Sequence, residues 1–349
     1  MRFLKTFGFV LCLLPAMAFA KNKITVAKDG SGDFTSIQKA IESFVPTKEK
    51  YKTIYIKNGT YNEKLFIDEA RHHLVLEGQS AQGVVITFTQ ARDIWRCENP
   101  NDYGAATVNV MASDVIFKNL TILNDYGFIA KGDEVISCPN EAGKSSTSTI
   151  QNYALPREKG EKDGEKIVRK DGHQFAFRSM PGATRLQFLG CVFRSGGGDT
   201  VSPWDVDGGL YYFKDCIIEG HVDLYCPRGN ALIEDSKFIC HNLSAAIWHD
   251  GSAKESDKTV LKNCSFEGKE GFKLGRYHRE AQMYLFDCHF SKEMADAPIY
   301  QSGDRKLEWG HRVFYKNCKR EGQDFAWFKD NTTAKSSDFT FKKMFGKAW

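Results

Sequence analysis

The sequence lacks an excess of charge of either sign, because 48 lysine and arginine residues oppose 44 aspartate and glutamate residues among 349. Without Arg2 and Lys5 of the leader described below, the formal charge falls from +4 to +2. Nucleic-acid binding requires a concentrated basic face, so we expect no nucleic-acid partner. No segment after the leader reaches the roughly 20 apolar residues that a transmembrane helix needs, and we expect no membrane anchor.

Three common catalytic signatures are missing as well. A serine hydrolase elbow requires Gly-x-Ser-x-Gly, and the nearest string, GQSAQG at 78–83, has one residue too many. Neither His72-His73 nor Cys240-His241 has partners at zinc-ligand spacing. The SGGGD string lacks the Lys-Ser/Thr of a phosphate loop. The sequence therefore predicts no metal and no cofactor, and leaves carboxylate chemistry as the candidate.

The first 20 residues resemble a cleavable secretory signal. They have a basic start, an apolar run and the ending Ala18-Phe19-Ala20. We therefore expect an exported protein, secreted or periplasmic. Residues 21–349 are expected to form a single domain that acts as a monomer.

Short strand-like segments recur along the chain and share one residue pattern. Segments such as LQFLGCVFRS, YYFKDCIIEG and TVLKNCSFEG carry aromatic or aliphatic residues, then Asn, Asp or Gly, then usually Cys. In steps of 20 to 30 residues, the last position falls at Cys191, Cys216, Ser236, Cys264, Cys288 and Cys318. Such steps are typical of solenoids, and we predict an all-β fold, a right-handed parallel β-helix with long surface loops.

The cysteines fit this repeat as buried thiols. Cysteine behaves as a small apolar side chain and is among the most buried residue types. A disulfide framework is the alternative in an exported chain. Residues 21–349 contain nine cysteines, an odd number, and five of them occupy the repeating position. Cys97 and Cys138 lie outside the repeat and are the better candidates for a disulfide.

Two apolar segments are suited to covering the ends of the solenoid. In FTSIQKAIESFV, a capping box of Thr35 with Gln38 precedes one apolar helical face, which predicts an N-terminal capping helix. The aromatic tail DFTFKKMFGKAW is expected to cover the other end. Residues 124–173 are polar and charged, and we expect a long loop insertion there that borders a functional site.

Two aspartates are the candidates for carboxylate chemistry. Asp199 follows three glycines in RSGGGDTVSP, and Asp223 lies 24 residues later in EGHVDLYC. A separation near one coil can place two side chains next to each other on one outer face. The glycine next to Asp199 is expected to leave room for a ligand to approach the backbone. Taken singly, each aspartate is more often a turn or surface residue.

The order of several motifs resembles the pectin methylesterase (pectinesterase) family of carbohydrate esterases. The matching segments are, in order, ITVAKDGSGDFTSIQKAIES, IYIKNGTYNEKL, AATVNV, HQFAFRS, GGGDT, IIEGHVDLYC and KLGRYH. The resemblance covers most of residues 21–349. It implies a right-handed parallel β-helix that uses no metal.

The resemblance also implies a role for each matching residue. Asp223 would be the nucleophile that forms an acyl-enzyme. Asp199 would be the acid that protonates the leaving methanol and then the base that accepts a proton from water. Arg276 would keep Asp223 ionised and oriented. Gln174 would stabilise the oxyanion and Thr107 would contact the sugar acid.

The chain departs from the family pattern around the same motifs. Gly198 stands where the family has a glutamine that helps to stabilise the oxyanion, and such a loss typically costs about 2.7 to 4 kcal/mol. His278 replaces a tryptophan that offers a stacking surface for the sugar. The segment LYCPRGNA is two residues longer than the family's, which could bring Arg228 toward the cleft. We therefore include His278 and Arg228, with Thr107, Gln174 and Arg276, among the substrate-binding candidates.

The resemblance implies an exported hydrolase that removes methyl esters from galacturonate units of pectin. The alternative is a catalytically weak or inactive β-helix that binds pectin or another uronate polysaccharide. A pectin lyase or glycosidase is less consistent with the sequence, since the Asp-Asp pair expected of an inverting glycosidase is missing and RSMPGATR matches a lyase motif only loosely.

Overall fold

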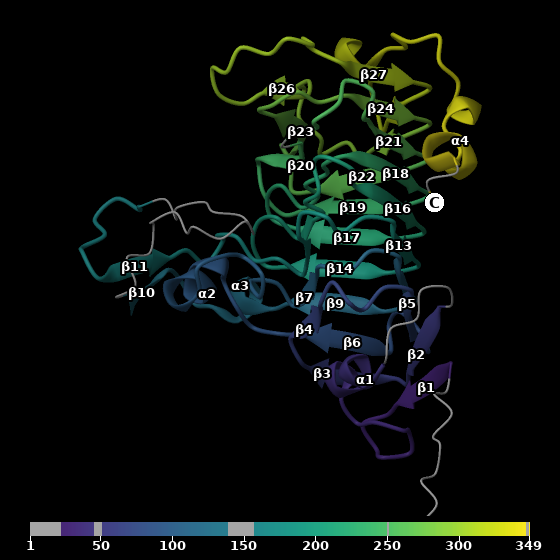
Figure 1. The fold of residues 1–349 in the computed structure, drawn as a ribbon. Helices are drawn as coiled ribbons and strands as arrows, with labels where there is room; N and C mark the ends of the chain where they lie inside the picture. Colours follow the sequence, from purple (N-terminus) through teal and green to yellow (C-terminus); the bar gives the residue numbers. More distant parts are fainter. Residues whose placement is uncertain (1–21, 45–50, 139–156, 250, 347–348) are drawn as a thin grey trace, which may run out of the picture.

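Short parallel strands stack into coils along one axis (Figure 1). The computed structural model describes residues 22–44, 51–138, 157–249, 251–346 and 349, and the predicted signal at 1–20 lies outside them. Within these residues, no helix combines the length and apolar character needed to span a membrane.

Three faces run along the stack. The first is a ten-stranded sheet of β1 (Lys23–Val26), β2 (Lys52–Ile56), β5 (Leu74–Gly78), β8 (Val115–Lys118), β13 (Leu186–Leu189), β16 (Leu210–Lys214), β18 (Asn230–Glu234), β21 (Thr259–Lys262), β24 (Met283–Phe286) and β27 (Val313–Lys316). The second is a nine-stranded sheet of β3 (Gly59–Asn62), β6 (Val84–Thr87), β9 (Thr121–Asn124), β14 (Val192–Ser195), β17 (Ile217–Gly220), β19 (Lys237–Cys240), β22 (Ser265–Gly268), β25 (His289–Phe290) and β28 (Lys319–Arg320).

The third face consists of two shorter sheets. One contains β4 (Leu65–Ile67), β7 (Val108–Val110), β12 (Phe177–Ser179) and β15 (Val201–Ser202), and the other contains β20 (Ala245–His249), β23 (Lys273–Tyr277) and β26 (Tyr300–Gln301). Isolated parallel bridges from Val201 to Tyr225 and from Tyr225 to Ile247 connect them. Because all pairings on the three faces are parallel, the fold is the predicted right-handed parallel β-helix.

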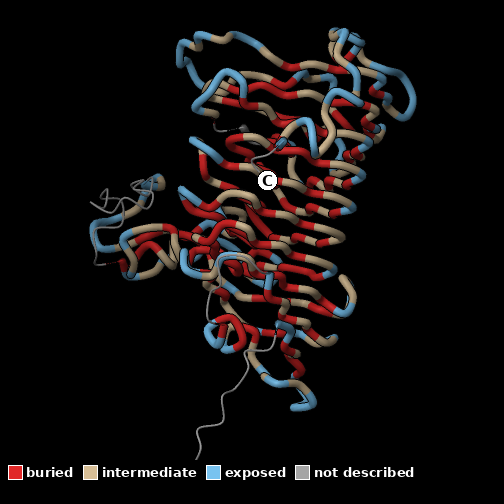
Figure 2. Tube along the Cα trace, turned by 45° about the vertical axis from the view of Figure 1, so that its right-hand side comes forward, coloured by how far each residue is buried: buried red, intermediate tan, exposed pale blue. Residues whose placement is uncertain are grey.

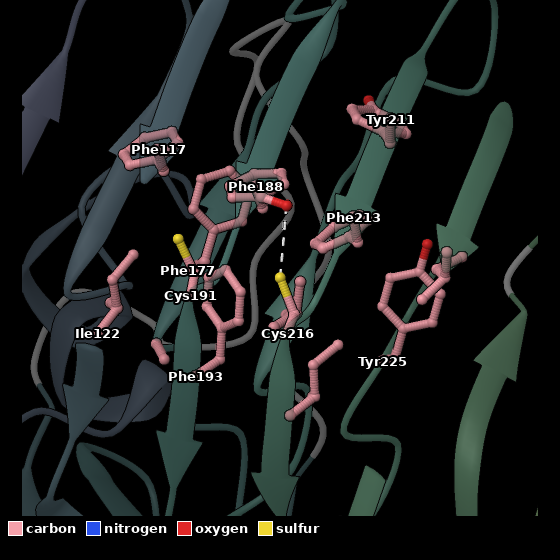
Figure 3. Packing of buried hydrophobic residues seen from close by; sticks show 14 of the residues in the cluster. Phe117, Ile122, Phe177, Phe188, Cys191, Phe193, Tyr211, Phe213, Cys216 and Tyr225 are labelled. Atoms are coloured by element: carbon pink, nitrogen blue, oxygen red, sulfur yellow. Dashed lines mark hydrogen bonds between the residues drawn. The ribbon is translucent and has the colours of Figure 1, made fainter. Parts of the chain in front are cut away.

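Inward side chains stack on equivalent side chains of the next coil. Phe117, Phe188 and Phe213 face one another across β8, β13 and β16, with stacked ring centroids 5.2 and 4.5 Å apart (Figure 3). Buried stretches recur along the strands of the stack, whereas exposed stretches gather on the loops (Figure 2). The parallel register thus builds one continuous core from a short repeated pattern.

The repeated Asn, Asp or Gly has a conformational cause. These residues lie at the corner between the first and second faces with positive φ, from 49° to 61°, and are Asn119, Gly190, Asp215, Asp235, Asn263, Asp287 and Asn317. Asn, Asp and Gly tolerate this left-handed conformation better than other residues. The position that follows points inward, and its cysteines are free and buried at Cys191, Cys216, Cys264, Cys288 and Cys318. The prediction of buried thiols is confirmed.

The N-terminal end is covered as predicted, but the helix cap is not the predicted one. Helix α1 (Ile37–Ser43) buries its apolar face in the main core, which includes the side chains of the first coils. Its N-cap is Ser36, whose hydroxyl accepts from the Lys39 amide, rather than Thr35. Glu63 from the neighbouring coil accepts from the amides of Ile37 and Gln38 and from the Ser36 hydroxyl. The capping box predicted for Thr35 and Gln38 is therefore wrong, because the Glu63 carboxylate accepts from the amides of the first turn.

The aromatic tail covers a side of the stack rather than its end. Helix α4 (Phe341–Phe345) packs with Phe339 and Trp349 against outward residues of the ten-stranded sheet, such as Tyr212 and Tyr284 (Figure 1). Two short 3-10 helices precede it, at Ala326–Phe328 and Ser336–Asp338. Phe328, from the first of them, packs on Phe290 of the last coils. The predicted end cap is therefore wrong, because the aromatic side chains of the tail pack on the apolar residues of the outer sheet face.

The polar insertion forms a lobe beside the stack (Figure 1). It contains α3 (Tyr126–Ile129) and the antiparallel pair β10 (Glu134–Ser137) and β11 (Glu165–Val168), next to α2 (Arg92–Glu98). Cys97 of α2 is joined to Cys138 by a disulfide, as predicted. Lys166 is buried between Glu161, 2.9 Å away, and Asp93 of α2, 3.9 Å away. Residues 139–156 of this region lie outside the described residues.

Removing one ring from the aromatic stack tests the core. Phe188→Ala should lower the free energy of unfolding by about 3–5 kcal/mol, because it leaves a cavity between two stacked rings. Chemical denaturation measures this loss, and Phe188→Leu should lose less. Phe128→Ala is the control, since Phe128 is 42% exposed. Equal effects of Phe188→Ala and Phe128→Ala would contradict the assignment of the core.

Candidate active site

The structure brings Asp199 and Asp223 together on neighbouring coils. Val201 pairs with Tyr225, and each lies two residues after its aspartate, so the aspartates occupy equivalent positions. The Asp199 amide donates to the carbonyl of Val222, at 3.1 Å. A separation of 24 residues therefore equals one coil here.

Both aspartates lie in left-handed turns, with φ of 57° at Asp199 and 52° at Asp223. This conformation is costly for most residues but tolerated by aspartate. It interrupts the strand alternation where each coil meets the cleft. Each carboxylate is thereby presented at the cleft surface, and both aspartates line the same cavity.

The glycines before Asp199 make room mainly for the protein chain. A Cβ at Gly196 would lie 2.5 Å from the backbone of Gly127, and one at Gly197 would lie 2.1 Å from the carbonyl oxygen of Gly172. Both glycines therefore allow close contact with neighbouring backbone rather than with a ligand. Gly198 differs, because it lines the cleft and a Cβ there would lie 3.2 Å from Val222.

Arg276 forms a two-point ion pair with Asp223. Its Nε donates to Oδ1 at 3.1 Å and its Nη2 donates to Oδ2 at 2.5 Å. Arg276 lies on β23, which is separated from the coil of Asp223 by β20. The arginine thus reaches back across one coil to hold the carboxylate in a fixed orientation.

Burial opposes the ionisation of Asp223. The side chain is 8% exposed. Burial raises its pKa from 3.8 to about 7, the hydrogen bonds from Arg276 oppose the shift, and the negative charge of Asp199 adds to it. Two neighbouring carboxylates with unequal surroundings can divide the roles of acid and base.

The cleft around these residues has a volume of about 570 Å³. His278 and Arg228 line it, as does His173, whose Nε2 lies 3.9 Å from Asp199 Oδ2. The polar insertion contributes Glu158, Arg169 and Asp171 to one wall.

Thr107 and Gln174 do not line the cleft. The Thr107 hydroxyl donates to the carbonyl of Leu123 at 2.9 Å. Gln174 is fully buried, where its Oε1 accepts from the Gly127 amide at 2.8 Å and its Nε2 donates to the carbonyl of Lys170 at 2.5 Å. His173 and Phe175, on either side of Gln174 in the chain, do line the cleft, whereas the Gln174 side chain is bonded to the backbone of Gly127 and Lys170.

Sequence reasoning missed a buried charge cluster in the wall of the cleft. The Asp102 carboxylate accepts from Arg92 at 2.9 Å, from Arg96 at 3.0 Å and from Arg178 at 2.9 Å. Burial alone would raise the pKa of Asp102, but Arg92 and Arg178 hold it well below the usual range. The spacing of Arg92, Arg96 and Asp102 is local and could have indicated the cluster. The approach of Arg178, 76 residues later, has no local signal.

No three His, Cys, Asp or Glu side chains in the described part of the chain form a group that could hold a metal ion. The fold and the cleft define a parallel β-helix protein whose cleft brings two carboxylates and an arginine together.

Comparison with known proteins finds matches in one family. The family model for pectinesterase matches residues 23–148. A putative pectinesterase 11 of Arabidopsis thaliana is 27% identical over 346 residues, which cover 93% of this chain and 80% of that relative. These matches confirm that the chain is related to the pectinesterases, which are carbohydrate esterases with a parallel β-helix. Family and fold together support a carboxylic ester hydrolase.

Solved structures share the fold. The pectin methylesterase from Aspergillus niger superposes with a TM-score of 0.66 at 19% identity, over 94% of this chain and 95% of that one. A pectin methylesterase in complex with a hexasaccharide gives a TM-score of 0.66 at 21% identity, over 92% of this chain and 96% of that one. At these identities the likeness concerns the fold alone.

The disulfide should stabilise the wall of the cleft more than the stack. Replacing both Cys97 and Cys138 by serine removes a link across 41 residues, and losses of about 2–4 kcal/mol are typical of such links. We expect faster hydrogen exchange at the amides of β10 and β11, with unchanged exchange in the ten-stranded sheet. Mass spectrometry of exchanged peptides measures both regions. Unchanged exchange in β10 and β11 would show that the ion pairs of Lys166 suffice to hold this wall.

Proposed function

We propose that the protein is an exported hydrolase that removes methyl esters from galacturonate units of pectin. One observation carries the proposal: Asp223 is held at two points by Arg276, one coil from Asp199, in an open cleft. An oriented carboxylate next to a second carboxylate is suited to nucleophilic catalysis with a separate proton donor. The relationship to the pectinesterases supports the same reaction.

The reaction has two steps in this arrangement. An oxygen of ionised Asp223 bonds to the ester carbonyl carbon, the bond from carbon to the methoxy oxygen breaks, and protonated Asp199 gives its proton to the departing methanol. Water then attacks the acyl-enzyme and gives one proton back to Asp199. The uronate carboxylic acid leaves, and the Asp223 carboxylate is restored.

Substrate and location follow from the surroundings of the site. Arg169, Arg276 and Arg279 line the cleft and suit a polymer that carries carboxylates. A hexasaccharide occupies one pectin methylesterase of the same fold. The Cys97–Cys138 disulfide suits an oxidising compartment, which agrees with the secretory signal predicted at 1–20.

A second candidate function is favoured by the placement of Gly198 and Gln174. Gly198 has no side chain to donate, and Gln174 is bonded to Gly127 and Lys170 outside the cleft lining. A cleft without an oxyanion donor would bind a uronate polysaccharide and hydrolyse its esters weakly or not at all.

Asparagine substitutions test the assignment. Asp223→Asn removes the nucleophile and Asp199→Asn removes the proton donor, so each should abolish methanol release from methylated pectin. Circular dichroism should show an unchanged β-helix, and Asp215→Asn is a matched control on the far corner of a coil. Activity retained in either variant would contradict the mechanism, and polymer binding by an inactive wild-type chain would favour the second candidate.

The pH dependence follows from the raised pKa of Asp223. Because burial favours the protonated form, the nucleophilic carboxylate accumulates as the pH rises through about 7. The reaction also needs a proton on Asp199 for the leaving methanol, so initial rates of methanol release should increase with pH along a limb centred near 7 for as long as Asp199 keeps that proton. Arg276→Gln removes the hydrogen bonds that favour the carboxylate, so the limb should move to higher pH. A limb centred near pH 4, or one unmoved by Arg276→Gln, would refute this account.

A further inference from the structure

The proposed reaction requires hydrogen-bond donors that the expected residues do not supply. Attack by Asp223 places negative charge on the ester carbonyl oxygen, and donors aimed at that oxygen lower the barrier. Gly198 has no side chain, and both amide atoms of Gln174 are bonded to the backbone outside the cleft lining. Arg276 is engaged by Asp223 at two points. Another donor in the cleft has to serve the oxyanion.

Four side chains that line the cleft form a stack of alternating rings and guanidinium groups. The Arg178 guanidinium lies 4.3 Å from the ring centroid of Phe175 and 4.7 Å from that of Trp204. The Arg228 guanidinium lies 3.2 Å from the ring centroid of Trp204. Contacts between guanidinium groups and aromatic faces are attractive and fix the plane of the guanidinium.

The stack is anchored at several points along its length. Arg178 donates to Asp102 at 2.9 Å and to the Ser202 hydroxyl at 3.3 Å. The Trp204 amide donates to the Ser179 hydroxyl at 2.9 Å. Arg228 is 2% exposed, and its Nη1 donates to the carbonyl of Cys226 at 3.2 Å. A guanidinium held in this way needs little reorganisation when a negative charge develops beside it.

The buried Cys226 lies between Asp223 and Arg228 in the chain and is hydrogen-bonded to both. The Cys226 Sγ donates to the carbonyl of Asp223 at 3.1 Å, and Cys226 lies two residues before Arg228. Burial raises the pKa of Cys226, the charges of Asp199 and Asp223 raise it further, and the charge of Arg228 opposes them. All three charged residues also line the same cleft. The stack therefore ends with a fixed cation close to the carboxylate pair.

We propose that Arg228, held on Trp204, donates to the oxyanion that forms when Asp223 attacks the ester, in place of a glutamine at position 198. This inference rests on the proposed esterase function. Guanidinium N–H groups in a site shielded from water stabilise a developing charge more strongly than a neutral amide does. Arg228 lies within LYCPRGNA, the segment that is two residues longer than the family pattern.

Two substitutions at position 228 test the role. Arg228→Ala should lower kcat for methanol release from methylated pectin roughly 100- to 1,000-fold and leave KM within about twofold, because the donor acts in the transition state. Arg228→Lys keeps the positive charge but loses the planar set of guanidinium N–H donors, and it should show an intermediate kcat. Arg194→Ala is the control, since Arg194 pairs with Glu219 on the nine-stranded sheet, and its kcat should match that of the wild type.

A glutamine at position 198 gives a second, independent test. Gly198→Gln should give no gain in the wild-type chain but recover at least tenfold in kcat when combined with Arg228→Ala, because it offers the missing donor. Equal gains from Gly198→Gln in both backgrounds would overturn the inference. An Arg228→Ala variant with raised KM and normal kcat would also overturn it, and would assign Arg228 to a uronate carboxylate instead.

The outcomes separate this inference from the proposed function. A wild-type chain that releases no methanol refutes the proposed function, and the role of Arg228 with it. An active wild type together with an unaltered kcat in Arg228→Ala refutes the role of Arg228 alone. Near-ultraviolet circular dichroism checks folding, and if Arg228→Ala does not fold, a normal kcat in Arg228→Lys overturns the inference.

Discussion

The parallel pairing of Val201 with Tyr225 places Asp199 beside Asp223, because each aspartate lies two residues before its paired strand residue. The site depends on this register. Inserting or deleting one residue in the intervening coil would turn one carboxylate away from the other, since strand side chains alternate between faces. The stacked rings of Phe188 and Phe213 fix the register from inside the same coils.

The chemistry uses the cost of burying charge. Asp223 is shielded from water, which favours its neutral form, and Arg276 restores part of the ionised form through two directed hydrogen bonds. A carboxylate balanced in this way is a better nucleophile than one that water solvates fully. Burial likewise opposes the ionisation of Asp102 in the wall of the cleft, and three arginines that share its carboxylate overcome this effect.

Features set by local chemistry could be predicted from the sequence. The recurring Asn, Asp or Gly followed by cysteine indicated the coils, because a left-handed corner and a small inward side chain recur once per coil. The aspartates and Arg276 stand in recognisable motifs. Features set by packing between distant segments could not be predicted. Glu63, rather than Gln38, accepts from the first-turn amides of α1, and the aromatic tail packs on the outer face of the ten-stranded sheet. Gln174 lies outside the cleft lining because its amide group bonds to the backbone of Gly127, 47 residues away, and of Lys170.

Two departures from the family pattern, Gly198 and the longer segment with Arg228, concern the same cleft in the fold. A side chain at position 198 would have to share space with Val222, since a Cβ there lies 3.2 Å from the valine Cγ1 and carbonyl oxygen. Glycine at this position relieves that crowding but gives up a donor. The longer segment before Gly229 carries Arg228 onto Trp204, in the cleft that Gly198 also lines. The side-chain donor that is missing at Gly198 on one coil is thus replaced by the Arg228 guanidinium on the next coil. The parallel stack allows this replacement because both coils contribute residues to the same cleft.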